Sequence, residues 1–449
     1  NTGWWTPASG EAMTGGIIAT CATNSNKLYA YLIGSGSNLY GYAGVWVSTD
    51  EGVSWTNPHP SNAIGNSPTA YAVPSHTNLM ASNGVTGFNQ GFYDMAIVVN
   101  PLNDNQLIAG GTSWFKSTDG GVTWSNLGGY VGGLSWSHPD IQWLAANGND
   151  LWIASDGGLN YSNNFGVTME TRMDGISGSN MWGFDSGWNE DILVGGRYHN
   201  GNMGFHQSFP AATVYRLGGA ESATGYVSPG PQRRVYHSDI GGKIIKPGFG
   251  NGVTNFGVSA WPNESYAYYA NSEMVFHPHY YNTIYLGNQN NLLVSRDAGA
   301  NFDILYTFPG TVDNEVYDIE ISRSNPQIMY CSQWDGTDDS IWKTTNGGTS
   351  WTKLTALPLP NNNDRVKMAL SSTDPNVLWV SVTYGSNEKK VYKTIDGGLT
   401  WINLTTALLN NITIANIMAQ YGTDGGVYIG TDAGVFYRNN SHADWQPYS

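Results

Sequence analysis

The chain has 449 residues, of which 57 are Gly, 40% are hydrophobic, 13% are aromatic and only 12% are charged, whereas ordinary soluble domains carry about 25% charged residues. This composition excludes disorder, because so many aromatic residues require a folded core. The formal net charge of -15 at pH 7 has the wrong sign for binding phosphates, so we expect neither nucleic acid nor an anionic membrane as a partner. No apolar run reaches the roughly 18 to 20 residues of a membrane-spanning helix, so we expect no membrane span.

The first residues of the chain and its two cysteines support three further predictions. The sequence begins at Asn1 without Met, and we expect a targeting signal to have been removed already. The opening residues NTGWWTPASG are expected to form an outermost strand. Cys21 and Cys331 lie in strand-like runs, which predicts two buried free thiols.

Five segments share the pattern Ser/Thr-x-Asp/Asn-x-Gly-x-x-Trp/Phe, and each follows a short apolar run with alternating polarity. They are STDEGVSW from Ser48, STDGGVTW from Ser117, SRDAGANF from Ser295, TTNGGTSW from Thr344 and TIDGGLTW from Thr394. The pattern predicts a hairpin turn in which the Asp or Asn accepts backbone N–H groups and Gly supplies a positive φ. The closing aromatic residue is expected to pack between sheets. We therefore assign a structural role to Asp50, Asp119, Asp297, Asn346 and Asp396.

More strand-turn-strand segments fill the gaps between these turns and bring the total to nine repeat units. The units start near residues 17, 93, 139, 180, 223, 272, 315, 366 and 412. Units of about four short strands at such intervals predict an all-β fold, a single large β-propeller over residues 1–449 with 8 to 10 blades. Two separate rings are the alternative, but no linker is visible in the sequence. Residues 57–90 lack strand alternation and are expected to form a functional or lid-like loop insertion.

The hairpin turns resemble the Asp-box (BNR) repeats of sialidases, of the xyloglucanase family and of sortilin-type propellers. A longer series of motifs resembles secreted bacterial sortilin-like propellers, which are glycosyl-hydrolase-like and are exported by the type IX route in Bacteroidetes. This series is QGFYDMAIVVNP from Gln90, SHPDIQW from Ser137, ASDGGLNYS from Ala154, VGGRYHNGN from Val194, GGAESATGYVSP from Gly218 and SEMVFHPHYYNTIYLG from Ser272. The resemblance implies an extracellular or cell-surface protein.

The polar positions of these motifs differ from those of the relatives. His138 and Asp140 match the first two positions of the relatives' HxDxH run, but Gln142 stands in place of the second His. Glu221 lies in a turn where the relatives have Asp-Gly. A sialidase is not expected, because the Arg-Ile-Pro segment is missing and no Arg precedes Arg172. Enzymes of the xyloglucanase family have two seven-bladed propellers in a much longer chain. One ring of this length is therefore not expected to be a whole enzyme of that family.

Ligands of propellers bind at the loops around the central channel, which points to the polar residues of the second to fifth repeats. For binding a substrate we select Asp94, His138, Arg197, His199, Trp261 and Tyr266. For a hydrolase, the acid and base are expected among Asp140, Asp156 and Glu221. His138, Asp140 and Asp156 are alternatively the ligands of a divalent cation such as Ca²⁺. The competing interpretation of each residue is a side chain that only satisfies turn N–H groups.

Two functions follow. The first is a secreted or cell-surface propeller, in part structural, that binds a glycan or an extracellular protein through its channel-mouth loops. The second is a glycoside hydrolase that acts on an extracellular polysaccharide with a carboxylate acid/base pair. The first is favoured, because the repeats are well kept while the polar motifs are changed.

Overall fold

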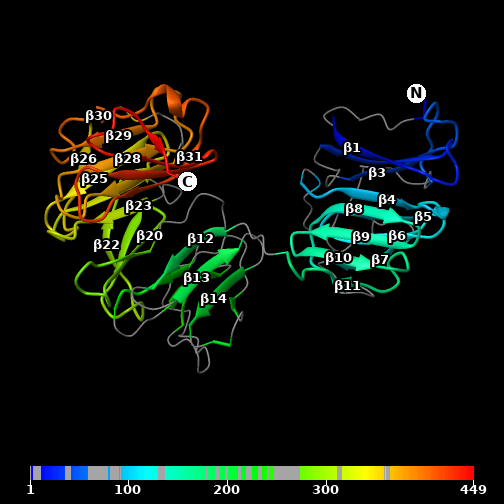
Figure 1. Cartoon of the computed structure of the whole chain (residues 1–449), viewed down its shortest axis with the longest axis horizontal. Helices are drawn as coiled ribbons and strands as arrows, with labels where there is room; N and C mark the ends of the chain where they lie inside the picture. The colour runs from blue at the N-terminus through cyan, green and yellow to red at the C-terminus, as the bar shows by residue number, and fades with distance from the viewer. Residues whose placement is uncertain are drawn as a thin grey trace. The chain divides into compact units, whose positions relative to one another are not determined.

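A computed structural model describes residues 2–3, 12–35, 42–58, 79–80, 91, 93–129, 137–176, 181–187, 192–197, 201–207, 209–210, 214–218, 225–230, 235–239, 242–246, 274–310, 316–357, 359 and 365–448. Within these residues every regular element is a β-strand except one 3-10 helix, η4 (Ala407–Leu409). The predicted all-β class is confirmed (Figure 1). In the same residues no helix has the length and apolar character to cross a bilayer.

The chain divides into two compact units, Asn1–Gly178 and Ser179–Ser449. In its described residues the first unit contains three antiparallel sheets. They are formed by β1 (Ala12–Thr20), β2 (Leu28–Ser35) and β3 (Tyr42–Ser48); by β4 (Ala96–Asn100), β5 (Asn103–Gly110), β6 (Ser113–Ser117) and β7 (Ser125–Gly129); and by β8 (Ile141–Asn147), β9 (Asp150–Ser155), β10 (Gly158–Ser162) and β11 (Glu170–Thr171).

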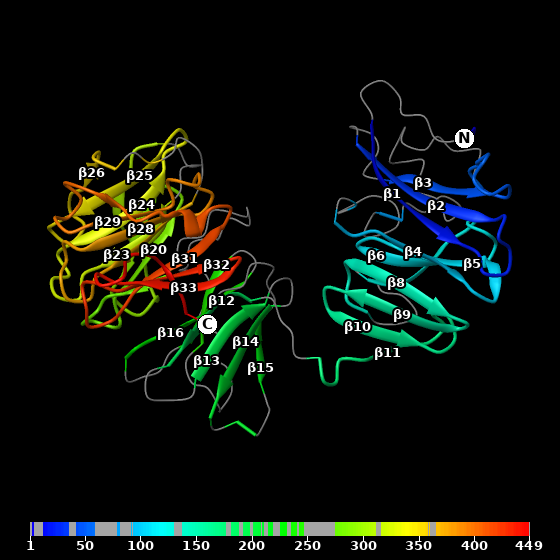
Figure 2. The same ribbon diagram turned by 45° about the horizontal axis from the view of Figure 1, so that its top comes forward.

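The second unit contains six such sheets among its described residues (Figure 2). The first three are formed by β12 (Met181–Ser186), β13 (Ile192–Arg197), β14 (Gly201–His206) and β15 (Tyr215–Gly218); by β16 (Gly225–Val227), β17 (Val235–Asp239) and β18 (Gly242–Lys246); and by β19 (Val275–Phe276), β20 (Ile284–Asn288), β21 (Asn291–Ser295) and β22 (Asp303–Thr307). The last three are formed by β23 (Val316–Ile321), β24 (Met329–Trp334), β25 (Asp339–Thr344) and β26 (Thr352–Leu354); by β27 (Val366–Leu370), β28 (Leu378–Val382), β29 (Val391–Thr394) and β30 (Ile402–Asn403); and by β31 (Ile414–Ala419), β32 (Val427–Thr431), β33 (Gly434–Arg438) and β34 (Gln446–Pro447).

Strands follow one another in sequence order in every sheet, so each sheet is an antiparallel meander. The first strands of successive sheets contact each other, as β4 contacts β8 and β23 contacts β27. The hydrophobic core lies between neighbouring sheets, where Tyr330 of β24 packs with Leu378 and Val380 of β28. All five residues of β28 are therefore buried. The nine sheets agree with the nine predicted repeat units, whereas a single ring over residues 1–449 stays a prediction.

The repeated turn is held by side-chain hydrogen bonds. Ser48 donates its hydroxyl to Asp50 Oδ1 (2.8 Å) and accepts the Gly52 N–H (2.8 Å), while Asp50 Oδ1 accepts the Ser54 N–H (2.8 Å). The same three bonds recur in the turns that begin at residues 117, 295, 344 and 394. Hydrogen bonds from Ser54 and Ser48 lower the pKa of Asp50 to about 2. The carboxylate is thus used to build the turn.

A sixth copy of this turn begins at Ser162 and was missed by the sequence pattern. Ser162 donates to Asn164 Oδ1 (2.9 Å), and the N–H groups of Gly166 and Thr168 complete the same network at 2.8 Å each. The pattern failed because Met169 stands where the other copies have an aromatic residue. The polar half of the motif is therefore sufficient to form the turn.

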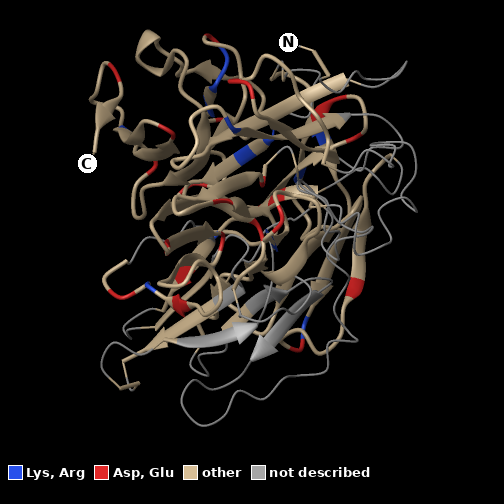
Figure 3. Cartoon of the chain, turned by 90° about the vertical axis from the view of Figure 1, so that its right-hand side faces the viewer, with Lys and Arg blue, Asp and Glu red and all other residues tan. Residues whose placement is uncertain are grey.

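A lysine precedes three of these turns and joins each sheet to the next one. Lys116 Nζ donates to the carbonyl oxygen of Phe165 in the next sheet (2.6 Å), and Lys343 Nζ donates to that of Gly397 (3.2 Å). Lys393 Nζ donates to the Asp424 carbonyl oxygen (3.0 Å). Burial lowers the pKa of all three ammonium groups. The sparse charges of this chain (Figure 3) thus include three inter-sheet links.

Other predictions concern the start of the chain and the insertion. Thr2 exchanges backbone hydrogen bonds with Val53 (3.0 Å) and Trp55 (2.8 Å) at the outer edge of the first sheet. Both cysteines are free and buried, as predicted. Most of the insertion at residues 57–90 lies outside the described residues. Its residues Leu79 and Met80 are fully buried, and Thr112 donates its hydroxyl to the Met80 carbonyl oxygen (3.2 Å).

Candidate functional site

Three of the predicted acidic residues meet in the first unit. Asp94 stands just before β4, Asp140 directly precedes β8, and Asp156 lies in the turn between β9 and β10. Because the first strands β4 and β8 are neighbours, the residues before them lie at the same end of their sheets. The Asp140 N–H donates to the Thr112 carbonyl oxygen, and the Asp156 N–H donates to the Asp140 carbonyl oxygen, both at 3.2 Å. We call these three residues and Gln142 the carboxylate cluster.

Gln142 bridges the cluster from a β-bulge. The register between β8 and β9 shifts between Ile141 and Trp143, which leaves Gln142 as the extra residue. Its Nε2 donates to Asp94 Oδ1 (2.6 Å) and to Asp156 Oδ1 (3.1 Å). Bulges commonly redirect a side chain in this way. The residue that replaces the relatives' second His is therefore a hydrogen-bond donor between two carboxyl groups.

The electrostatics of the cluster separate Asp94 from its neighbours. The Asp94 residue is 0% exposed. Burial, followed by the negative charges of Asp140 and Asp156, raises the pKa of Asp94 to about 8, and the bond from Gln142 opposes this rise. Asp94 therefore holds a proton at neutral pH. Asp140 is also buried and has a φ of 65°, a left-handed conformation that is uncommon for residues other than Gly.

The other predicted site residues, apart from His138, lie wholly or partly outside the described residues. The backbone of Arg197 lies in β13, and its side chain lies outside the description. His199, Glu221, Trp261 and Tyr266 also lie outside the described residues.

The predicted cation has no ligand set among the described residues. No group of three or more His, Cys, Asp or Glu side chains there is arranged to hold a metal ion. The His138 side chain packs directly against Gly157, because a Cβ added to Gly157 would lie only 2.2 Å from the His138 Cβ. The His138 Nδ1 is 3.0 Å from the carbonyl oxygen of Pro139. The cation stays a prediction.

A pocket of about 550 Å³ in the second unit was not predicted. Its wall includes Asp185 at the end of β12, Val227 at the end of β16 and Glu320 near the end of β23. The segment after β19 adds His277 and Tyr281. The pocket, which also includes Arg323 and Tyr421, is called the strand-end pocket because it lies at the carboxyl ends of several first strands. Its volume is typical of small-molecule sites.

The imidazole of His277 has a defined state in this pocket. Its Nδ1 accepts the backbone N–H groups of His279 and Tyr280, each at 3.1 Å. Burial and the neighbouring His279 lower the pKa of His277, so the ring is neutral at physiological pH. With Nδ1 used as an acceptor, the proton resides on Nε2. His277 therefore offers a fixed hydrogen-bond donor.

Aromatic and charged groups complete the strand-end pocket. Tyr281 and Tyr421 are exposed, and the Arg323 guanidinium lies 5.4 Å from the centre of the Tyr421 ring. The Asp185 carboxylate accepts the N–H groups of Val227 (2.9 Å) and Ser186 (2.8 Å), and burial raises its pKa. Asp185 thus links two sheets, whereas the rings and Arg323 are placed to meet a ligand.

The sequence contained signals for part of this pocket. Tyr280 and Tyr281 lie in the polar run HPHYYN, a place where exposed rings are expected. No pattern joins them to Glu320 or Tyr421, because those residues come from other repeat units. Only the packing of first strands brings them together.

Comparison with known proteins bears on the fold. No protein-family model and no curated protein matches the chain. A GH74 xyloglucanase from Xanthomonas campestris matches 96% of this chain and 69% of its own, with 14% identity and a TM-score of 0.52. This likeness, together with nine small meander sheets, decides the architecture. The chain has a β-propeller fold.

Two further propeller-like matches have lower scores. The extracellular domain of a one-component system from B. thetaiotaomicron matches 96% of this chain and 66% of its own, with 11% identity and a TM-score of 0.41. A GH74 enzyme from Niastella koreensis matches 96% of this chain and 77% of its own, with 14% identity and a TM-score of 0.34.

Proposed function

We propose that this β-propeller binds a neutral glycan in the strand-end pocket. The observation that carries the proposal is the convergence of exposed tyrosine rings with fixed polar groups in one small-molecule-sized pocket. Sugar rings stack their C–H faces on aromatic rings and use their hydroxyls as donors and acceptors. Tyr281 and Tyr421 supply rings, His277 supplies an N–H donor, and Glu320 supplies an acceptor.

The balance of charge in this pocket favours a neutral ligand. Arg323 faces a pocket that also contains the carboxyl groups of Asp185 and Glu320. An anionic sugar would meet these two acidic groups against a single guanidinium. The X. campestris protein whose fold resembles this chain is a xyloglucanase, an enzyme that acts on a glycan. A charge-poor, acidic chain suits a secreted or cell-surface protein of this kind, which is where we place it.

The test is binding to soluble neutral polysaccharides, namely xyloglucan, mixed-linkage β-glucan, xylan and galactomannan, by affinity electrophoresis and calorimetry. We expect saturable binding to at least one of them and a loss of about tenfold in Tyr281→Ala and in Arg323→Ala. Tyr384→Ala is the matched control, because Tyr384 is an exposed tyrosine of the same unit that does not line the pocket. Binding to none of the four polysaccharides, or equal losses in all three variants, would refute the proposal.

A glycoside hydrolase is the second candidate, and the carboxylate cluster is the observation that favours it. Asp94 and Asp156 accept hydrogen bonds from the same Gln142 nitrogen. Their bonded oxygens are therefore no more than roughly 6 Å apart, an upper bound that includes the 5 to 5.5 Å of retaining enzymes. One carboxyl is protonated and the other is half-buried at the edge of the cluster. The two groups thus resemble an acid and a nucleophile.

Release of reducing ends from the same polysaccharides tests this second candidate. Hydrolysis that disappears in Asp156→Asn, while binding at the strand-end pocket persists, would support it. Activity retained in Asp156→Asn would exclude the cluster as the catalytic centre. The two candidates are distinguishable, since the variants of one site leave the other unchanged.

A further inference from the structure

Two pairs of neighbouring sheets in the second unit close tightly at the repeated turn. Leu305 and Leu354 each stand three residues after the aromatic residue that closes a turn. A Cβ added to Gly348 would lie 2.6 Å from Leu305 Cδ2, and one added to Gly398 would lie 2.5 Å from Leu354 Cδ1. The glycine at the fifth position of each turn thus receives the leucine of the preceding sheet. These two junctions have no space left for a ligand at that point.

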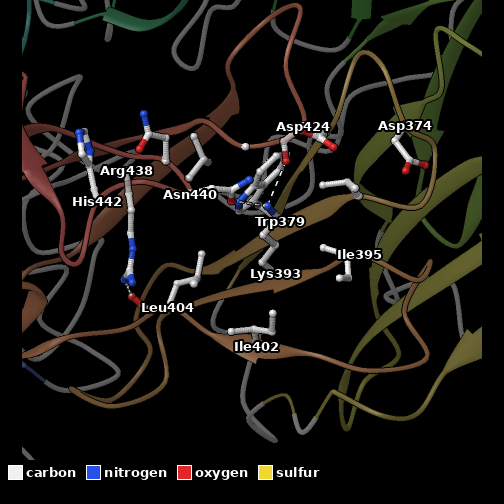
Figure 4. Close-up of a pocket in the computed structure, with 14 residues that line it drawn as sticks. Asp374, Trp379, Lys393, Ile395, Ile402, Leu404, Asp424, Arg438, Asn440 and His442 are labelled. Carbon is white, nitrogen blue, oxygen red and sulfur yellow. Dashed lines mark hydrogen bonds between the residues drawn. The ribbon is translucent and has the colours of Figure 1, made fainter.

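The last junction, between the β27–β30 sheet and the β31–β34 sheet, is built differently. The corresponding turn spans residues 438–445 and has His442 at its fifth position instead of Gly. In three other turns the closing Trp donates its indole N–H to the fifth residue's carbonyl oxygen. Here Trp445 donates to Leu404 of the neighbouring sheet (2.9 Å), as Arg438 also does (3.0 Å). A pocket of about 570 Å³ lies at this junction (Figure 4).

Its two walls differ in chemistry. Ile395 and Ile402 form the wall on the β27–β30 side and are 57% and 51% exposed. Asp424, Asn440 and His442 form the opposite wall, and Figure 4 shows them across from the two isoleucines. We call this space the junction pocket. An exposed aliphatic wall facing an amide, an imidazole and a carboxylate suits a ligand that is itself apolar on one side and polar on the other.

The floor of the junction pocket excludes a stacked sugar ring. Trp379 is 0% exposed, and the Lys393 ammonium lies 4.7 Å from the centre of its ring. Lys393 also donates to Asn440 Oδ1 (3.2 Å), which leaves the amide N–H groups of Asn440 for a ligand. Among the described residues that line the pocket, none presents an exposed aromatic face, in contrast to the strand-end pocket.

The charges at the junction pocket are balanced. Lys393 and Arg438 bring two positive charges, and Asp374 and Asp424 bring two negative ones. A strongly charged ligand therefore gains little there. An extended peptide has the required chemistry, because its backbone carbonyl and N–H groups complement the Asn440 amide and the Asp424 carboxylate. An aliphatic side chain of that peptide would cover Ile395 and Ile402.

We propose that the junction pocket binds an extended, uncharged peptide segment of a protein partner through one aliphatic side chain. This inference is independent of the glycan site, because it uses other residues and another kind of ligand. The pocket lies beside the turn that has His442 at the position where the six other described turns have Gly.

The experiment uses the full chain and a blocked peptide, acetyl-Ser-Gly-Leu-Gly-Ser-amide, with saturation-transfer NMR and calorimetry. We expect saturable binding that requires the Leu, so that the same peptide with Ser in its place does not bind. Ile402→Asp is expected to weaken binding at least tenfold. Leu399→Asp is the matched control, because Leu399 is 75% exposed in the same sheet but does not line the pocket.

A second variant guards against a folding artefact. His442→Gly restores the residue of the other turns and is expected to close the junction and reduce binding without adding a charge. The absence of saturable binding to the wild-type chain would overturn the proposal, as would equal affinities of Ile402→Asp and Leu399→Asp. Competition by cellotriose at this pocket would also overturn it, because it would identify the ligand as a sugar.

Discussion

Replacing Asp94 with Asn tests the carboxylate cluster most directly. Asp94 is buried beside Asp140 and Asp156, and its pKa is raised from 3.8 to about 8. The unfolded chain has an ordinary Asp pKa, so between pH 4 and 8 the folded chain holds one more proton than the unfolded chain does. Stability therefore falls as pH rises across this window, by about 1.4 kcal/mol per pH unit, and the loss is complete above the folded pKa.

Asn imitates the protonated acid without taking up a proton. Its amide oxygen can accept the Gln142 donor, which bonds Asp94 at 2.6 Å, and its N–H₂ can donate to Asp140. At pH 7 the protonation of Asp94 lowers the free energy of unfolding of the wild-type chain by about 4 kcal/mol. This value is an upper limit, because the coupled carboxylates share their charge. We expect Asp94→Asn to be more stable than wild type by up to that amount at pH 7, and by more at pH 8.

Urea unfolding followed by tryptophan fluorescence at pH 5, 6, 7 and 8 measures the effect. The free-energy difference between variant and wild type is expected to grow with pH, from small at pH 5 to largest at pH 8. Asp174→Asn is the control, because Asp174 is exposed in the same unit, and we expect no such trend there. A constant difference across the pH range, or a destabilised variant at pH 8, would refute the assignment of the proton to Asp94.

Three more outcomes are expected. Hydrogen bonds from Thr400 and Thr394 lower the pKa of Asp396 to about 2, so the stabilisation from its carboxylate is present above about pH 4 and is lost as pH falls toward 2. Asp396→Asn copies Asn346 of another turn and is expected to show a smaller fall in Tm than wild type between pH 5 and 2. An unchanged fall in Tm would contradict the turn assignment. Lys116→Met removes the charged bond to the Phe165 carbonyl oxygen and is expected to cost about 1.5 to 3 kcal/mol in urea unfolding, whereas a loss within error would show that the link is dispensable. Burial lowers the pKa of His277, so glycan affinity at the strand-end pocket is expected to be constant from pH 6.5 to 8 and to weaken in more acidic solution. Calorimetry measures this affinity, and the strongest binding at pH 5 would exclude neutral His277 as the donor.

The repeated turn could be predicted from the sequence because all of its hydrogen bonds are local. Ser48, Asp50 and Ser54 lie within seven residues of one another, so their spacing alone defines the geometry. The sixth copy was missed only because the pattern demanded an aromatic residue at Met169. Meander sheets followed from the same periodicity. The lysine before three of the turns was also visible in the sequence, but its partner in the next sheet was not.

The functional sites were less predictable because they depend on contacts between repeats. Asp94, Asp140 and Asp156 lie close together because each stands next to a strand that begins at the same end of its sheet. The role of Gln142 was not foreseen, because the amino-acid sequence of β8 does not reveal its β-bulge. The strand-end pocket as a whole was not predicted, although Tyr281 lies in a polar run where exposed rings are expected. Its residues come from separate units, and neither Glu320 nor Tyr421 belongs to a motif.

The inter-sheet lysines give the array a direction. Lys116, Lys343 and Lys393 all reach from their own sheet to the one that follows it in the sequence. Removing the final sheet would leave Lys393 without its acceptors, whereas removing the opening sheet would disturb none of these three bonds. Shortening the chain is therefore asymmetric. Removing the β31–β34 sheet leaves the Lys393 ammonium without its acceptors, and removing the β27–β30 sheet as well does the same to Lys343, whereas trimming from the N-terminal end leaves none of these three ammonium groups without its acceptor. In a circularly permuted chain that begins with the β31–β34 sheet, Lys393 and its acceptor Asp424 would lie near opposite ends of the chain. The bond between them would then have to form between the two ends.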